Sequence, residues 1–100
     1  MSEPSNIIPK VVFEDHRIRA EELRIPPGKS TVRHTHREDF LVIVLKGTPK
    51  LRISHDDGSF QDHELPTGAV RMPPAKGDTH WATNLGREEY WDITVHLKEG

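Results

Sequence analysis

The chain has 100 residues, about a third of them hydrophobic, and it contains no cysteine. A chain of this length forms one domain with a modest core. Without cysteine it can form neither disulfides nor thiolate metal ligands, so any metal site must use His, Asp or Glu. The formal charge of −2 comes from evenly scattered charged residues, which offer no basic face for nucleic acid. We expect no nucleic-acid partner.

No apolar run approaches the roughly 20 residues that cross a bilayer, so we expect no membrane partner. The first six residues, Met-Ser-Glu-Pro-Ser-Asn, lack the basic and apolar regions of a signal peptide. We therefore expect a cytoplasmic protein.

The first part of the chain is expected to form a flexible arm and then two strands. Residues 1–10 are polar with two prolines and predict a flexible N-terminal arm, and residues 11–100 predict a single domain. Val11-Val12-Phe13 fits a first strand. Residues 17–25 fit a second strand, because Pro26-Pro27-Gly28 closes it at once.

The middle of the chain predicts three strands. Residues 40–45 are apolar at both parities, which indicates a strand covered on both faces. Residues 50–55 alternate, with Leu51 and Ile53 on one face. Asp56-Asp57-Gly58-Ser59 then favours a two-residue hairpin turn, since Asp-Gly readily adopts positive φ angles, and residues 60–65 return as the second hairpin strand.

The last part of the chain predicts strands at 69–72, 78–84 and 90–97, with Pro- and Gly-rich turns between them. Many short strands without helical periodicity indicate an antiparallel all-β sandwich or barrel. The last strand alternates an apolar row with a polar row, the latter made of Tyr90, Asp92, Thr94 and His96. If the polar row lines the barrel, His96 or Asp92 could act as an acid–base group or support a metal ligand. If the apolar row lines it, which is the more usual arrangement, both residues are solvated.

Three histidines form a candidate metal site. The strand that follows Gly28 carries His34 and His36, and the two-residue period of a strand puts both imidazoles on the same face. A divalent metal needs a further ligand, and His80 on the predicted strand 78–84 is the candidate. The His-x-His spacing alone is a weak signal in a chain with seven histidines, so two surface histidines remain an alternative. His16, His55 and His63 lie among charged or turn residues and are interpreted as surface residues.

These positions resemble the two sequence motifs of the cupins. The first motif is matched by Gly28, His34, His36 and Gly47, and the second by Gly68, Pro74, Gly77, His80 and Asn84, with one extra residue between the proline and the second glycine. The resemblance covers most of residues 28–84 and implies an antiparallel jelly-roll β-barrel that holds one divalent transition metal.

The resemblance also shows a departure, because Phe40 stands where cupins usually carry a glutamate ligand, counted back from Gly47. Strict alternation from Phe40 points Asp39 away from the metal, although a bulge could turn it inward. We therefore expect a site of three histidines, with Asp39 as a further candidate. Such nitrogen ligands suit Fe, Ni, Cu, Zn and, less well, Mn. The predicted substrate pocket comprises Phe40, Val42, Met72, Ala82 and Asn84.

The resemblance implies a metal-dependent dioxygenase, an oxidoreductase acting on a small chelating molecule such as a diketone or a hydroxy acid. A zinc- or nickel-dependent isomerase or hydrolase is an alternative. A non-catalytic cupin that binds or senses a small molecule is another alternative, because a bulky ring at position 40 would crowd a co-ligand. We also expect a homodimer, since an outer row of Leu41, Ile43 and Leu45 would suit contact between subunits.

Overall fold

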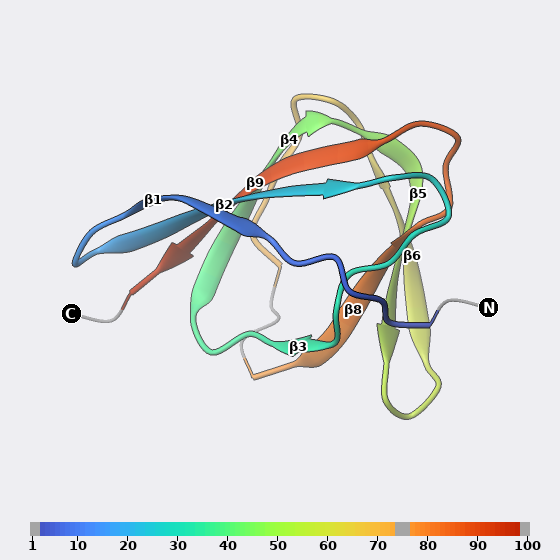
Figure 1. The fold of residues 1–100 in the computed structure, drawn as a ribbon, viewed down its shortest axis with the longest axis horizontal. Helices are drawn as coiled ribbons and strands as arrows, with labels where there is room; N and C mark the ends of the chain where they lie inside the picture. Colours follow the sequence, from blue (N-terminus) through green and yellow to red (C-terminus); the bar gives the residue numbers. More distant parts are fainter. Residues whose placement is uncertain (1–2, 74–76, 99–100) are drawn as a thin grey trace.

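The computed structural model describes residues 3–73 and 77–98, which form nine strands in two antiparallel sheets. Figure 1 shows the strands of the two sheets around a common interior. One sheet has the order β1-β2-β9-β4-β7 and contains β1 (Lys10–Glu14), β2 (Ile18–Ile25), β4 (Asp39–Lys46), β7 (Val70–Arg71) and β9 (Tyr90–Leu97). The other has the order β3-β8-β5-β6 and contains β3 (His34–Thr35), β5 (Thr48–His55), β6 (Phe60–Leu65) and β8 (Thr79–Asn84). The predicted all-β jelly-roll fold is confirmed.

Every predicted strand is present, but two are much shorter than expected. The strand that carries the first two histidines is reduced to β3, which pairs with β8 only at His34↔His80 and Thr35↔Thr79. The strand predicted at 69–72 is reduced to β7, which pairs only with Val42 and Ile43 of β4. Both lie at the edge of a sheet, where a strand has only one neighbour to pair with. The described residues contain no helix long and apolar enough to cross a membrane.

Two glycines are needed for the turns that flank β5. The chain turns from β5 into β6 through Asp56, Asp57 and Gly58, since the amide of His55 donates to the carbonyl of Ser59 at 3.0 Å. The loop therefore has three residues rather than the predicted two, and Gly58 takes the left-handed position at φ +89°, as is usual for this loop length. At Gly47 a Cβ atom would lie 2.0 Å from the carbonyl oxygen of Leu65, so no larger residue fits.

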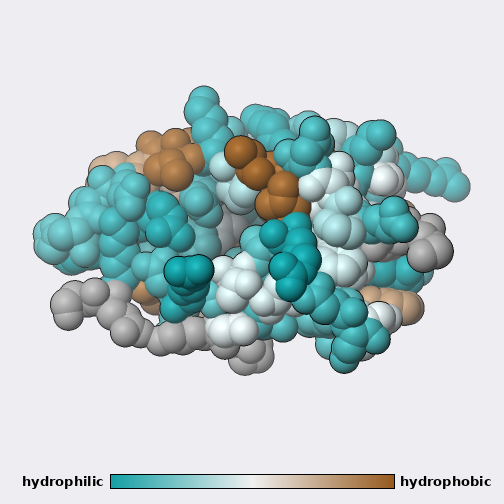
Figure 2. Space-filling model, turned by 60° about the horizontal axis from the view of Figure 1, so that its bottom comes forward, coloured by the Kyte–Doolittle hydropathy of each residue, from teal (hydrophilic) through white to brown (hydrophobic). Residues whose placement is uncertain are grey.

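The outer row of β4 is less covered than the sequence predicts. Phe40 and Val44 are buried on the inner face, but Leu41 and Ile43 are half-buried and Leu45 is 38% exposed. Among the described residues this face is therefore only partly covered, and the strand is not buried on both faces as predicted. Figure 2 shows one face of the molecule, where small hydrophobic patches stand among mainly hydrophilic residues.

The last strand, β9, turns its polar row inward. Tyr90, Asp92, Thr94 and His96 are all buried, whereas the residues of the apolar row are half-buried. The more usual arrangement, with the polar row solvated, is therefore wrong for this protein. On the outer face Trp91 is covered by the guanidinium of Arg24, 4.0 Å from its ring centroid, which explains how an apolar row is tolerated there.

The hydrophobic core occupies one end of the barrel. It consists of Ile25, Val44, Leu51, Ala82 and Tyr90. The strand register explains this position, because Ile25 pairs with Tyr90 at one end of the β2–β9 ladder while Arg19 pairs with His96 toward the other. The inward residues of β9 thus run from the core at Tyr90 to the other end of the barrel at His96.

Part of the arm that was expected to be flexible is attached to the domain. The amide of Ser5 donates to the carbonyl of Thr31 at 2.9 Å, and the amide of Val32 donates to the carbonyl of Ile7 at 2.9 Å. Ile7 also packs against the core, and Lys10 already belongs to β1. The arm from Ser5 onward therefore lies along the barrel rather than extending from it.

Asn84, which the sequence placed in the substrate pocket, lies in the closed end of the barrel and is fully buried. Its Nδ2 donates to the carbonyls of Ile25 (2.9 Å) and Glu88 (2.7 Å). Its Oδ1 accepts from the hydroxyl of Thr48 and the amide of Gly86, both at 2.9 Å. All four hydrogen-bonding positions of the amide are used. The pocket assignment is therefore wrong, because this side chain holds the turn between β8 and β9.

We expect Asn84→Ala to destabilise the protein by about 2–4 kcal/mol, because it removes the partners of the buried Ile25 carbonyl and the buried Thr48 hydroxyl. Urea unfolding measures the change. The control is Asn6→Ala, because Asn6 is exposed and its side chain accepts a surface hydrogen bond from the neighbouring Ser5. Equal unfolding midpoints for the two variants would contradict the structural role assigned to Asn84.

Candidate metal centre

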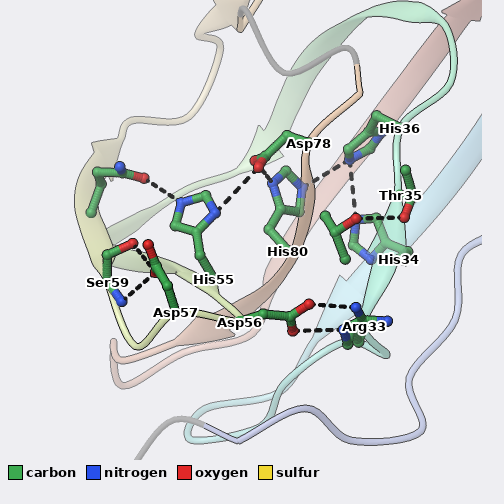
Figure 3. Close-up of polar contacts among 12 residues, drawn as sticks. Arg33, His34, Thr35, His36, His55, Asp56, Asp57, Ser59, Asp78 and His80 are labelled. Atoms are coloured by element: carbon green, nitrogen blue, oxygen red, sulfur yellow. Dashed lines mark hydrogen bonds and ion pairs between the residues drawn. The ribbon is translucent and has the colours of Figure 1, made fainter.

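The three predicted histidines meet at one point. His34 is placed by β3, His80 faces it from β8, and His36 follows directly after β3. The Nε2 atom of His36 lies 3.1 Å from that of His34 and 2.9 Å from that of His80, as Figure 3 shows. Among the described residues these three form a group that could hold a metal ion.

Hydrogen bonds at Nδ1 fix the orientation of two of these rings, so that their Nε2 atoms face the centre of the group and can act as acceptors. The Nδ1–H of His34 donates to the carbonyl of Val32 at 2.8 Å, and the Nδ1–H of His80 donates to the carboxylate of Asp78 at 2.8 Å. In each neutral ring this leaves the Nε2 lone pair free. His36 has one Nε2 proton at most and can satisfy only one of the two neighbouring lone pairs. A cation at the centre would satisfy all three nitrogens, so this donor set fits a divalent metal.

The surroundings of His36 and His80 favour the neutral form of these two rings. Burial, together with the neighbouring imidazoles, lowers the pKa of His36 to about 3. Burial also lowers the pKa of His80, although the hydrogen bond to Asp78 works in the opposite direction. Metal binding requires deprotonated imidazole, so the rings are held in the form that a metal needs.

Asp78 is a supporting residue that the sequence analysis missed. One carboxylate oxygen accepts from His80, and the other lies 3.3 Å from Nδ1 of His55. A carboxylate behind a ligating imidazole fixes the ring and makes its free nitrogen more basic. The Asp-x-His spacing could have revealed this contact, because residues two apart share a strand face.

His55 was interpreted as a surface residue, and the structure corrects this. Its side chain is 19% exposed, lines the central cavity and contacts Oε1 of Gln61 at 3.0 Å. The hydrogen bond to Gln61 is the main cause of the raised pKa of His55. Its place at the end of β5 brings it beside Asp78, which sequence spacing could not show.

Position 40 faces the histidines, as alternation predicted. Phe40 is buried, and its ring stacks on that of His36 with the centroids 4.1 Å apart. Asp39, the further ligand candidate, is exposed and stands outside the histidine group. An aromatic ring therefore occupies the place where an acidic ligand was expected from the resemblance.

His96 lies next to this centre and is paired with an acid. Its ring centroid is 6.0 Å from that of His36, and its Nε2–H donates to Oε1 of Glu21 at 2.6 Å. The same hydrogen bond lowers the pKa of Glu21. The carboxylate fixes the proton of His96 on Nε2 and leaves Nδ1 as a proton acceptor.

A cavity of about 1190 Å³ extends from the histidines into the barrel. This is large enough for a small organic molecule. Of the predicted pocket residues, Phe40, Val42, Met72 and Ala82 line it. Met72 is 61% exposed. Pro74 of the second motif lies outside the described residues.

Deeper in the cavity, Asp92 is a buried acid held by two hydroxyl groups. The Tyr90 hydroxyl donates to Oδ2 at 2.7 Å, and the Thr94 hydroxyl donates to Oδ1 at 3.0 Å. Burial raises the pKa of Asp92 to about 6, although these two hydrogen bonds act against the increase. Burial, with the nearby Asp92, also raises the pKa of Tyr90.

Comparison with known proteins identifies the fold. No protein-family model matches the chain, and no curated protein matches it. Among solved structures, a cupin domain from Bordetella pertussis Tohama I is 27% identical, with a TM-score of 0.83 and coverage of 99% of both chains. A cupin superfamily protein from Desulfitobacterium hafniense is 19% identical, with a TM-score of 0.67 over 99% of this chain and 84% of that one.

A third similar structure is an RmlC-like cupin family protein with a double-stranded β-helix fold from Methanocaldococcus jannaschii. It is 12% identical, with a TM-score of 0.67, and the match covers 92% of this chain and 80% of that one. The predicted resemblance is therefore confirmed at the level of the fold. The chain has the fold of these cupin proteins, and three of its histidines stand close enough together to hold a metal ion.

The raised pKa of Asp92 predicts a specific pH dependence of stability. The folded-state pKa of about 6 exceeds the ordinary value of 3.8, so the folded protein binds more protons between these values and loses stability as the pH rises through them. Asn at position 92 does not titrate. We expect the stability of Asp92→Asn relative to wild type to increase by up to about 3 kcal/mol between about pH 4 and pH 7.

Urea unfolding of wild type and variant at pH 4 and pH 7 measures this change. The cost of the hydrogen bonds altered by the substitution is the same at both pH values and therefore cancels when the two are compared. Asp57→Asn is the control, because hydrogen bonds from Ser59 lower the pKa of Asp57 below the ordinary value of 3.8. The stability of that variant relative to wild type should therefore change little between about pH 4 and pH 7. An Asp92→Asn difference that is independent of pH would show that burial does not perturb this carboxyl group.

Proposed function

We propose that the protein binds one divalent transition metal through His34, His36 and His80 and acts as a dioxygenase on a small organic molecule that chelates this metal. The observation that carries the proposal is the meeting of three Nε2 atoms on histidines that line a large cavity. Fe, Ni, Zn, Mn and Cu all accept nitrogen ligands. Iron is the metal that we favour.

The chemistry of the donor set supports an anionic, chelating substrate. Three neutral imidazoles leave the full charge of the ion uncompensated, and a bound metal of this kind supplies Lewis acidity and, with iron, the capacity to activate dioxygen. Asp78 and the carbonyl of Val32 hold the histidine rings in place. Phe40 covers one side of His36 and excludes water from that side.

We assign His96 as the acid–base group of the proposed reaction. It lines the cavity beside His36, and Glu21 orients its ring. With the proton of His96 held on Nε2, Nδ1 can accept a proton from a neutral substrate, which thereby becomes an anion. A carboxylate that orients the histidine also stabilises the imidazolium formed in this step.

A non-catalytic cupin that binds a small molecule is the second candidate function. Phe40 favours it, because this ring replaces an acidic ligand and stacks directly on His36. In that case the cavity binds its ligand without turnover. The expected homodimer and the expected cytoplasmic location stay predictions.

The metal site is tested by elemental analysis of protein purified without chelators or an affinity tag. We expect near one equivalent of a transition metal in the wild type and in His63→Ala, because His63 is exposed and lies outside the histidine group. His80→Ala should lose the metal, because it removes one of the three nitrogen ligands. Full occupancy in His80→Ala would refute the three-histidine site.

Catalysis is tested by oxygen uptake of the iron-loaded protein with acetylacetone and with mandelate, a diketone and a hydroxy acid. We expect uptake that depends on the metal and the organic probe and is absent in His80→Ala. His96→Gln should keep the metal but lower the rate by about hundredfold, the usual contribution of an acid–base group. Full metal occupancy without uptake on either probe would favour the ligand-binding cupin.

A further inference from the structure

Asp92 is the buried acid of the cavity that the proposed reaction does not use. It lies on β9 between Leu23 of β2 and Val44 of β4, lines the cavity and is 3% exposed. Each of its oxygens accepts one hydrogen bond, from Tyr90 and from Thr94. A carboxylate offers about four acceptor positions, so both oxygens can accept another donor.

The carboxylate has no counter-ion among the described residues. Arg19 also lines the cavity but is paired with Glu21 and with Glu38, at 3.5 and 3.1 Å. His96, on the same face of β9, donates to Glu21. An unpaired buried charge is costly, and a strongly perturbed acid in a cleft is a candidate for a functional role.

The walls around Asp92 indicate the kind of molecule that fits there. Leu23, Val42, Leu51 and Ile53 line the same cavity and present apolar surface, and Leu23 lies directly opposite Asp92 in the β2–β9 ladder. An anionic group would be repelled at this end of the cavity. A cationic group on an apolar stem would be paired by the carboxylate and covered by the side chains.

We propose that the cavity binds small molecules carrying a positively charged amino group and that Asp92 is the counter-ion for this group. Asp92 and His96 are four residues apart, about 13 Å along the strand, so the amino group is bound far from the histidines. The identity of the substrate rests in addition on the proposed metal function. With a metal bound by the histidines, the substrate is an amino compound that carries its chelating group at the end opposite the amino group.

Binding of hexylammonium to the metal-free protein tests the proposal by isothermal titration calorimetry, with hexanol as the uncharged probe of equal length. We expect the wild type to bind hexylammonium at least about tenfold more tightly than hexanol, because hydrogen bonds to charged groups are strong. Asp92→Asn should abolish this preference while still binding hexanol. Glu64→Gln, which removes an exposed carboxylate at the cavity, should retain it.

A second pair of variants keeps the test independent of the folding of Asp92→Asn. Leu23 pairs directly with Asp92, so Leu23→Lys should place an internal ammonium beside the carboxylate and remove the preference for hexylammonium. Leu23→Met should preserve it. The proposal would be overturned if the wild type did not prefer hexylammonium over hexanol. It would also be overturned if Asp92→Asn kept this preference, or if Glu64→Gln lost it to the same extent as Asp92→Asn. Because no metal is added, failure of the proposed metal site would leave this result unchanged.

Discussion

The short pairing of β3 with β8 is the constraint on which the candidate metal centre depends. His34 and His80 are 46 residues apart in the sequence but lie directly opposite each other in this ladder. Main-chain hydrogen bonds between His36 and the 77–78 segment extend the contact beyond the strand. The histidine rings are therefore positioned by backbone pairing at the edge of a sheet, and Asp78 on the same segment can support His80.

The inward polar row of β9 gives the cavity its chemical character. A barrel filled entirely with apolar side chains would bury more hydrophobic area, but here the core is confined to one end and the polar groups are satisfied by one another. Tyr90 and Thr94 donate to Asp92, and His96 donates to Glu21. Among the described residues no buried side-chain nitrogen or oxygen lacks a partner. The polar interior is therefore compatible with folding while leaving acceptor capacity for a ligand.

The two ends of the cavity differ in electrostatic character. At the histidine end, neutral nitrogens are arranged to receive a cation, and a cation held there would attract an anionic group. At the Asp92 end, a buried carboxylate is arranged to receive a donor or a positive charge. This opposite polarity over one barrel length would select ligands by the separation of their charged groups as well as by their shape. One small domain could in this way combine the proposed metal site with the proposed amine-binding site.

The sequence by itself determined the strands, the turn residues and the cupin resemblance, because alternation, glycine and proline act locally. It also predicted which face of β4 carries Phe40 and that His34 and His36 point the same way. It could not determine which row of β9 faces inward, since alternation defines two faces but not their direction, and here the polar row is inside. Only the tertiary structure showed that His55 stands beside Asp78 and that Asn84 holds a turn, because these contacts depend on strand register.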